Sequence, residues 1–256
     1  MRLLVINPNT SHEMTGTIEA AARAAAGPGV TVDAVCPDYG PASIEGCFDE
    51  VVSAYWALDK VMRVAQDYDG FIVACFSAHP VIGALREALT QPTMGIMEAS
   101  ILHALPLGSR FSIVTTSPRW QPLLEEGVRL LGVESRCASV RSSGLAVLDL
   151  DALPQDAVLQ RLCAEAQAAV EEDGAEVICL GCAGMAGLEE AIRESTGVPV
   201  IDGVRAAVVL VQSLVSTEAR TSKRNLYRPV DQRPGLQLPN GIAIAYGPRR
   251  DQKELP

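Results

Sequence analysis

The sequence has few basic residues, few aromatic residues and no long apolar run. Its net charge is −10, from 21 lysines and arginines against 31 aspartates and glutamates, and aromatic residues make up 4% of the chain. A surface that follows a phosphate backbone needs a basic patch, so this balance argues against a nucleic-acid partner. No segment approaches the roughly 20 apolar residues of a membrane helix, and the N-terminus lacks the apolar core and cleavage site of a signal peptide. We therefore expect a cytoplasmic protein that binds neither nucleic acid nor a membrane.

The sequence also lacks the patterns of a disulfide framework, a metal site and a nucleotide site. Its seven cysteines are an odd number in a chain without a secretion signal, which is typical of reduced thiols. Cys179 and Cys182 form a lone C-x-x-C in which Cys179 falls inside a predicted strand, and the three histidines are scattered. The glycine spacings match neither a P-loop nor a dinucleotide fingerprint. We expect no metal and no cofactor.

The two halves of the chain share a faint internal similarity. Strand-like segments begin at Arg2 and Arg110, 108 positions apart, and Cys75 and Cys182 lie 107 positions apart. Pro92 in the first half and Pro199 in the second are also 107 positions apart. Such an offset indicates a duplicated unit.

Within each half, strand patterns alternate with helical patterns. Apolar runs predict strands at 3–7, 30–35, 71–75, 110–116 and 176–181, and helical spacing or capping residues predict helices at 12–26, 48–66, 80–89, 118–131, 156–172, 188–196 and 203–215. Alternation of this kind implies parallel sheets covered on both faces. The sequence therefore predicts an α/β fold with two pseudo-symmetric lobes, each a parallel sheet flanked by helices. The predicted division is 1–100 plus 204–216 for the first lobe, 101–203 for the second and 217–256 for a C-terminal extension, and we expect the helix at 203–215 to pack back across the first lobe.

Cys75 and Cys182 occupy matching places at the ends of two predicted strands. Small residues follow each of them, in the segments 77–78 and 183–184. Ligands of parallel sheets bind beyond the carboxyl ends of the strands, so two facing lobes would place these thiols on either side of one cleft. A cysteine in an apolar strand is more often a small apolar residue, and we interpret the other five cysteines in that way. The matched placement sets these two apart.

Two facing thiols suit proton transfer at carbon. One thiolate can remove a proton while the opposite thiol supplies one, which inverts the stereocentre without a cofactor. We expect the N-terminus of the helix after each strand to lower the thiol pKa, and the enolate intermediate needs hydrogen-bond donors. The expected donors are the backbone N–H groups of Phe76, Ser77, Ala183 and Gly184 and the hydroxyls of Thr115 and Thr116.

Two further polar features adjoin these strand ends. His79 lies four residues after Cys75, and it either modulates that thiol as a base or caps the helix that begins at Pro80. The turn "NPNT" at 7–10 follows the first strand. It serves as a turn and helix cap, and it places Asn9 or Thr10 at the rim of the same cleft.

Six segments together resemble the hydantoin and allantoin racemases of the aspartate/glutamate racemase superfamily. They are "LLVINPNTS" at the start, "YGPASIEG" at 39–46, "ACF" at 74–76, "RFSIVTT" at 110–116, "LGCAGM" at 180–185 and "VPVIDGV" at 198–204. The resemblance extends over about residues 1–216 and implies two pseudo-symmetric α/β lobes, a cofactor-independent mechanism with two cysteines at Cys75 and Cys182, and a homo-oligomer. It also implies a substrate pocket lined by Asn9, Ile44, Ser77, Thr115, Thr116, Gly184 and Met185.

The substrate that this resemblance implies is a small cyclic ureide. The Cys-Asn-Thr and Cys-Thr-His patterns of amino-acid racemases are missing, whereas a neutral, planar ring can meet backbone donors and acceptors. One departure is that many hydantoin racemases continue Cys-Phe with Gly-Asp-Pro, where this chain has Ser77-Ala78-His79-Pro80. Allantoin and other 5-substituted hydantoins therefore both stay open as substrates.

Two other functions compete with racemisation. A related isomerase or decarboxylase acting on a small dicarboxylate would use one of the thiols, although no paired Arg or Lys near either loop provides a carboxylate clamp. A non-catalytic, two-lobed small-molecule-binding protein would carry inert cysteines. The extension is rich in Arg, Pro and polar residues. It is either loosely docked or flexible, and its segment 241–247 could pair as a strand or contact another subunit.

Overall fold

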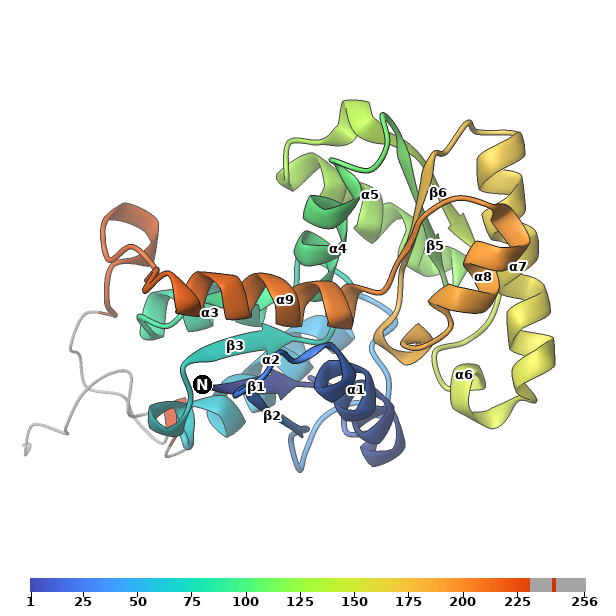
Figure 1. The fold of residues 1–256 in the computed structure, drawn as a ribbon. Helices are drawn as coiled ribbons and strands as arrows, with labels where there is room; N and C mark the ends of the chain where they lie inside the picture. The colour runs from blue at the N-terminus through green and yellow to red at the C-terminus, as the bar shows by residue number, and fades with distance from the viewer. Residues whose placement is uncertain (231–240, 243–256) are drawn as a thin grey trace, which may run out of the picture.

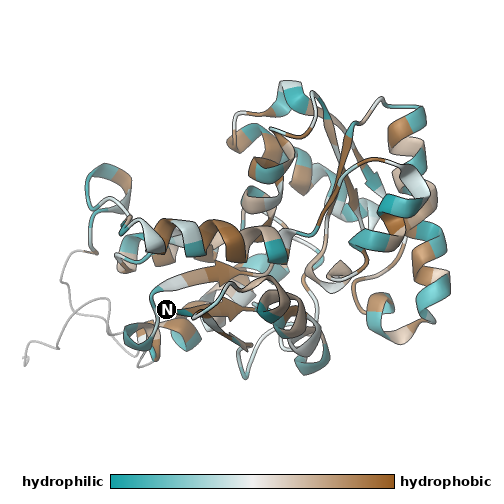
Figure 2. Ribbon diagram, in the orientation of Figure 1, coloured by the Kyte–Doolittle hydropathy of each residue, from teal (hydrophilic) through white to brown (hydrophobic). Residues whose placement is uncertain are grey.

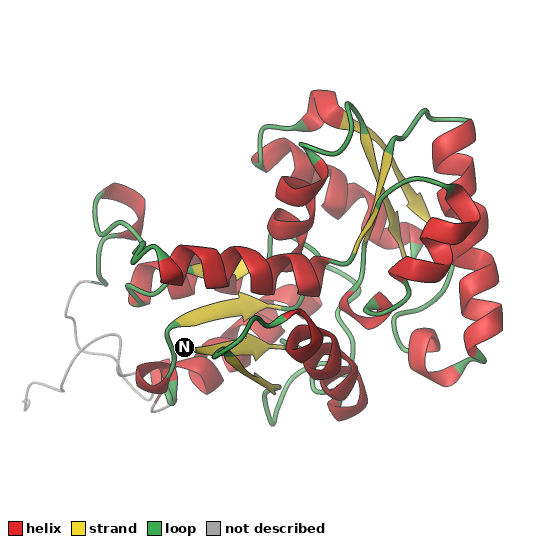
Figure 3. Ribbon diagram, viewed as in Figure 1, coloured by secondary structure: helices red, strands yellow, loops and turns green. Residues whose placement is uncertain are grey.

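The computed structural model describes residues 1–230 and 241–242, which form two α/β lobes (Figure 1). Each lobe contains a four-stranded parallel sheet, in the order β2-β1-β3-β4 in the first lobe and β6-β5-β7-β8 in the second. The two orders are equivalent, strand for strand. The predicted α/β fold of two pseudo-symmetric lobes is therefore confirmed, and Figure 3 shows each sheet among its helices.

The first lobe is built on the four N-terminal strands. Its elements are β1 (Arg2–Ile6), α1 (His12–Ala25), β2 (Thr31–Val35), α2 (Cys47–Met62), β3 (Gly70–Val73), α3 (Pro80–Ala88) and β4 (Thr93–Gly95). The last helix, α9 (Gly203–Ser216), returns to this lobe and packs on β3, β4 and α1, as the sequence predicts. Helices α2 and α3 pack against each other and lie behind the sheet in the view of Figure 1.

The second lobe repeats the pattern. Its elements are α4 (Ile96–Ala104), β5 (Phe111–Thr115), α5 (Gln121–Leu130), β6 (Cys137–Ser142), α6 (Asp149–Ala152), α7 (Gln155–Glu171), β7 (Val177–Leu180), α8 (Glu189–Thr196) and β8 (Val200–Ile201). Short 3₁₀ turns lie at Ala65–Asp67, Pro118–Trp120, Glu134–Arg136, Ala183–Met185 and Asn225–Tyr227. Helix α4 joins the lobes, because it packs on α9 of the first and on β7 of the second. Within the described residues, none of the helices combines the length and the apolar character that a membrane crossing requires.

The central strands are apolar on both faces because helices cover both faces. Residues 3–6 of β1 and 71–73 of β3 are fully buried, and so are the residues of β7 apart from a trace at Leu180. Continuous apolar runs of this kind are typical of parallel strands covered on both faces. Figure 2 shows these strands as mostly hydrophobic, whereas α7 and α8 carry hydrophilic turns on the outside.

Local signals fix where several helices begin and end. The Ser11 side chain accepts a hydrogen bond from the Met14 amide and caps α1. Gly197 ends α8 with a left-handed φ of 72°, a conformation that glycine adopts without strain.

The described part of the C-terminal extension docks on the first lobe. The Lys223 ammonium donates to the carbonyls of Arg86 and Glu87 at the end of α3. The amides of Gly241 and Ile242 donate to the Asp59 carboxylate on α2. Most of the segment that we predicted as an additional strand, from residue 243 onwards, lies outside the described residues.

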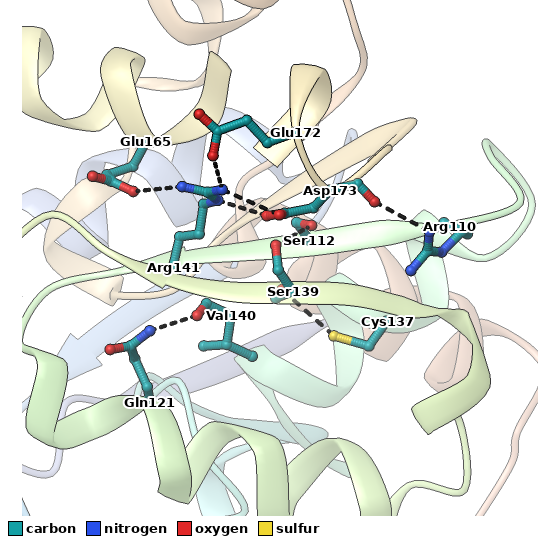
Figure 4. A network of polar contacts seen from close by, with 10 residues as sticks. All are labelled: Arg110, Ser112, Gln121, Cys137, Ser139, Val140, Arg141, Glu165, Glu172 and Asp173. Atoms are coloured by element: carbon teal, nitrogen blue, oxygen red, sulfur yellow. Dashed lines mark hydrogen bonds and ion pairs between the residues drawn. The ribbon is translucent and has the colours of Figure 1, made fainter. Parts of the chain in front are cut away.

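Strand β6 lies at one edge of the second sheet, and Arg141 joins it to helix α7 and the turn after it. Arg141 Nε donates to Asp173 Oδ2 at 2.6 Å, Nη2 to Glu172 Oε2 at 2.5 Å and Nη1 lies 3.4 Å from Glu165 Oε2 (Figure 4). The hydrogen bonds that the guanidinium donates to Asp173 and to the neighbouring carboxylates raise the pKa of Arg141 above its usual range. Arg141 lies on β6, and its three acidic partners lie on α7 and directly after it, outside the short segments that carry Cys75 and Cys182.

Candidate active site

A cavity between the two lobes takes its walls from the carboxyl ends of both sheets. Its volume is about 360 Å³, counting the space that opens to solvent. Cys75 is the second residue after β3, and Cys182 is the second residue after β7. Both cysteines line the cavity. Equivalent positions of the two lobes thus deliver the two thiols to one space.

The structure places some of the predicted site residues on the cavity wall and others behind it. Asn9, Ile44, Phe76, Thr116 and Ala183 line the cavity with the two cysteines. Ser77, Thr115, Gly184 and Met185 are not among its lining residues. The Thr115 hydroxyl instead donates to the Gly181 carbonyl at 3.0 Å, which ties the ends of β5 and β7 together.

A glycine lets the chain pass from β7 to Cys182. A Cβ at Gly181 would stand 2.8 Å from Thr115 Cβ and 2.9 Å from the Val114 carbonyl oxygen. Such separations are shorter than real Cβ contacts, and both neighbouring atoms belong to the packed strand β5. Position 181 therefore requires glycine, because a larger residue there would clash with β5.

The Cys75 thiol lies in a buried, polar niche. Its side chain is 8% exposed, and Sγ lies 3.6 Å from the Ser77 hydroxyl oxygen. That hydroxyl donates to Glu50 Oε1 at 2.6 Å. Burial raises the pKa of the Cys75 thiol far above its usual range; the Ser77 hydrogen bond opposes this rise, and the charges of Glu50 and Cys182 add to it.

Cys182 has a milder environment. It keeps part of its surface open to solvent. Burial raises the pKa of its thiol to about 11; a hydrogen bond from the Gly184 backbone lowers it, and the charges of Asp151 and Glu45 raise it. Both cysteines are therefore neutral thiols at pH 7 in this arrangement.

The expectation that helix N-termini lower the thiol pKa is wrong for this structure. Helix α3 begins only at Pro80, and Cys182 is followed by the 3₁₀ turn Ala183–Met185, with α8 beginning only at Glu189. A helix terminus acts over about its first turn, so neither α-helix reaches its thiol. Desolvation outweighs the local donors at both sites.

His79 caps α3 and is held in one tautomer. Its Nδ1 accepts from the Val81 amide at 3.3 Å, which leaves the proton on Nε2, 3.0 Å from the Ser53 hydroxyl. Burial lowers its pKa to about 4, so the ring is neutral at pH 7. The ring does not line the cavity with Cys75, and its role as a modulator of that thiol stays a prediction.

The turn after β1 is held by two asparagines. Asn7, which is fully buried, donates to Asn9 Oδ1 at 2.8 Å and to the Thr15 hydroxyl at 3.0 Å. Asn9 Oδ1 also accepts the Ser11 amide at 2.8 Å, whereas Asn9 Nδ2 lies 3.4 Å from the sulfur of Met14. A thioether is a weak acceptor, so the Asn9 amide can donate to a ligand. Thr10 is the other residue expected at the rim. Its amide and its hydroxyl donate to the Pro41 carbonyl and so hold the loop that bears Ile44.

Sequence reasoning missed several residues of the cavity wall. These are Asn7, Pro8, Met14, Ala74, Trp120, Val147 and Gly181. Trp120 also bridges the lobes, because its indole N–H donates to the Phe76 carbonyl at 3.3 Å. The Ser117-Pro118 pair signalled the helix start there, but no pattern showed that this tryptophan turns into the cleft.

The cavity wall carries no charged side chain. Its lining residues include no lysine, arginine, aspartate or glutamate. In the part of the chain that the structure describes, no group of three or more His, Cys, Asp and Glu side chains is arranged to hold a metal ion. The wall offers amide, hydroxyl and backbone groups, which suit a small, polar, uncharged ligand.

Comparisons with known proteins show which family the chain resembles. A family model described as Asp/Glu/Hydantoin racemase matches residues 3–211. A hydantoin racemase of Pseudomonas sp. (strain NS671) is 40% identical over 229 residues, which cover 89% of this chain and 91% of that protein. The crystal structure of allantoin racemase from Pseudomonas fluorescens is 43% identical, with a TM-score of 0.89, over 92% of this chain and 100% of that one. Allantoin racemase from Klebsiella pneumoniae is 40% identical, also with a TM-score of 0.89, over 94% of this chain and 98% of that one.

Proposed function

The chain belongs to the Asp/Glu/hydantoin racemase family, and from this premise we propose that it racemises allantoin or another 5-substituted hydantoin, without a cofactor, by proton transfer between Cys75 and Cys182. The observation that carries the proposal is that two thiols from equivalent strand ends line one cavity. Relatives named for racemisation of these two substrate types match nearly the whole chain.

In the proposed reaction, one cysteine acts as a thiolate and takes the proton from the stereogenic carbon. The electron pair passes to the adjacent ring carbonyl and forms an enolate. The opposite thiol then gives its proton to the other face of the carbon, and the carbonyl re-forms. One proton is removed and one is added, so the substrate changes configuration without oxidation or reduction.

The enolate oxygen needs donors that are in place before charge develops. The Asn9 amide group, the Thr116 hydroxyl and the backbone amides of Phe76 and Ala183 belong to lining residues and can serve. The other two predicted amides are already engaged, since the Ser77 amide donates to the Cys75 carbonyl and the Gly184 amide faces the Cys182 sulfur. Contact of substrate with Ser77, Thr115, Gly184 and Met185 stays a prediction.

The neutral wall favours a cyclic ureide over a charged substrate. A dicarboxylate or an amino-acid zwitterion would leave its carboxylate without a cationic partner among the lining residues, and an unpaired charge in such a cavity is costly. A hydantoin ring presents only carbonyl and N–H groups. This argues against the dicarboxylate isomerase and decarboxylase alternatives.

The test is racemisation of a single enantiomer. Purified protein is mixed with (S)- or (R)-allantoin, or with 5-substituted hydantoins, in deuterated buffer without added cofactor. We expect optical rotation to decay while deuterium enters the stereocentre. Cys75→Ala and Cys182→Ala should each abolish racemisation, because either thiol alone serves one face, whereas the exposed Cys47→Ala variant should retain it.

Three results would contradict the proposal. Racemisation at the wild-type rate by either active-site variant would rule out the two-thiol scheme. Absence of exchange with allantoin and with every hydantoin would contradict the substrate class. Tight ligand binding with no exchange would instead favour the non-catalytic alternative.

We also propose that the protein is cytoplasmic and forms a homo-oligomer. Helix α2 exposes Phe48 at 78%, Val51 at 68% and Tyr55 at 40%. Their spacing places them along one side of the helix, and contiguous exposed apolar side chains commonly mark a contact with another chain.

A further inference from the structure

Behind the Cys75 thiol, a hydroxyl and a carboxyl continue a line of polar groups. The Cys75 sulfur lies 3.6 Å from Ser77 Oγ, and Ser77 Oγ lies 2.6 Å from Glu50 Oε1. Ser77 is 4% exposed, whereas Glu50 is only partly buried, in the first turn of α2. The line therefore begins at a thiol of the cavity and ends at a carboxyl that meets solvent.

The proposed reaction creates a need for such a line. When Cys182 takes a proton from substrate and Cys75 gives one, the enzyme is left with a Cys75 thiolate and a Cys182 thiol. Another turnover in the same direction requires that Cys75 regain a proton and Cys182 lose one. Cys182 is partly open to solvent, but Cys75 is 8% exposed, so Cys75 is the thiol that needs a path.

We propose that Glu50, acting through the Ser77 hydroxyl, relays protons between solvent and Cys75 and so resets this thiol between turnovers. The inference rests on the proposed racemisation. In the resetting step, Ser77 gives its hydroxyl proton to the Cys75 thiolate and takes the carboxyl proton of Glu50. Glu50 is then protonated by water. The reverse sequence removes a proton from Cys75, and in both directions protons are the only atoms that move.

The surroundings of Glu50 support this role. Burial raises the pKa of its carboxyl, against the opposing hydrogen bond from Ser77, and so brings it closer to neutral pH. The charge of ionised Glu50 raises the pKa of Cys75, so the two groups are electrostatically coupled. The nearby His79 takes no part, because its ring is neutral and contacts Ser53 rather than Ser77.

Glu50→Gln tests the relay with little change of shape. The glutamine keeps an acceptor for the Ser77 hydroxyl but cannot pass a proton. We expect kcat to fall at least about tenfold, at the low end of general acid–base effects, with KM within about twofold because Glu50 does not line the cavity. Formate added to a Glu50→Ala variant should restore part of kcat, since it supplies a small carboxylic acid at a site that meets solvent.

Two further variants separate a relay from general damage. Ser77→Ala interrupts the same line, so the double variant with Glu50→Gln should be no slower than the slower single variant; residues that act as one unit are not additive. Asp49→Asn is the matched control, because Asp49 occupies the same helical turn but accepts the Glu45 amide. It should keep kcat within about twofold. Multiplied effects in the double variant would overturn the relay.

A measurement without substrate distinguishes failure of the relay from failure of the proposed function. Glu50→Gln removes a negative charge beside Cys75, so iodoacetamide should modify Cys75 several-fold faster at pH 8, as read by peptide mass spectrometry. Faster alkylation together with slower turnover supports the relay. Unchanged kcat in Glu50→Gln would overturn the relay while leaving racemisation intact. If the wild type racemises nothing, the proposed function fails on its own, and equal alkylation rates would then also overturn the coupling of Glu50 to Cys75.

Discussion

The two thiols of the cavity have different environments. The pKa of Cys182 is raised by burial to about 11, with a backbone donor that favours its thiolate. The pKa of Cys75 is raised further, by deeper burial and by the charges of Glu50 and Cys182. A thiolate therefore forms more readily at Cys182, so in the proposed racemisation we expect Cys182 to act as the base and Cys75 as the acid.

This asymmetry predicts the order of chemical modification. Because the thiolate is the nucleophile, alkylation of Cys182 should rise about tenfold per pH unit between pH 7 and pH 10, below its pKa of about 11. Cys75 should react more slowly throughout. Peptide mass spectrometry after brief iodoacetamide treatment measures both rates, with the exposed Cys47 as an internal reference. Faster modification of Cys75 would reverse the assignment of base and acid.

Residues at strand ends could be predicted, whereas residues that arrive by helix packing could not. Cys75, Cys182 and Asn9 follow apolar strands, and the edge of a parallel sheet brings such residues together. Trp120 and Glu50 come from helical segments beside the cleft. The direction in which such a side chain points depends on how its helix packs against the sheet. A residue pattern shows which side of a helix is buried, but it does not show which element covers that side.

At the scale of elements, the sequence predicted the central strands and most of the helices, but it did not predict β4, β6, β8 or α4. The helix predicted at 188–196 is α8, which begins at Glu189. The error was to expect its N-terminus to reach Cys182, because the 3₁₀ turn Ala183–Met185 and Gly187, with a left-handed φ of 87°, lie between them. The missing helix terminus leaves burial to set the pKa of the Cys182 thiol.

The edge strand β6 depends on Arg141, and this contact can be tested apart from the active site. Arg141→Gln removes the ion pairs that join β6 to Asp173 and Glu172. We expect the free energy of unfolding to fall by about 1–2 kcal/mol, because partly exposed ion pairs contribute up to about 1 kcal/mol each, with racemisation unchanged. Urea denaturation followed by circular dichroism measures this loss.

The matched control lies on the outside of α8. Arg193→Gln breaks a single exposed pair with Glu190 within one helix, and it should change the free energy of unfolding by less than about 0.5 kcal/mol. Equal effects of the two substitutions would show that the Arg141 network contributes nothing beyond an ordinary surface pair.

At the scale of the whole molecule, the duplication determines the active site. Neither lobe holds both thiols, and the contact of α4 with both lobes and the Trp120–Phe76 hydrogen bond keep the two halves together. The constant offset between the halves predicted this arrangement. The offset says nothing about the surface of the proposed subunit contact, because a surface shared between copies leaves no periodic signal within one chain.

The exposed side of α2 gives the last prediction. If Phe48, Val51 and Tyr55 form the subunit contact, light scattering after size exclusion should give the wild type a mass that is a multiple of 27.1 kDa. Phe48→Glu should shift it to smaller species, because burying an unpaired carboxylate opposes assembly. Leu226→Glu is the matched control, since Leu226 is also 78% exposed but lies on the extension. A wild-type protein that stays monomeric at high concentration, or equal dissociation by the two substitutions, would exclude this face as the contact.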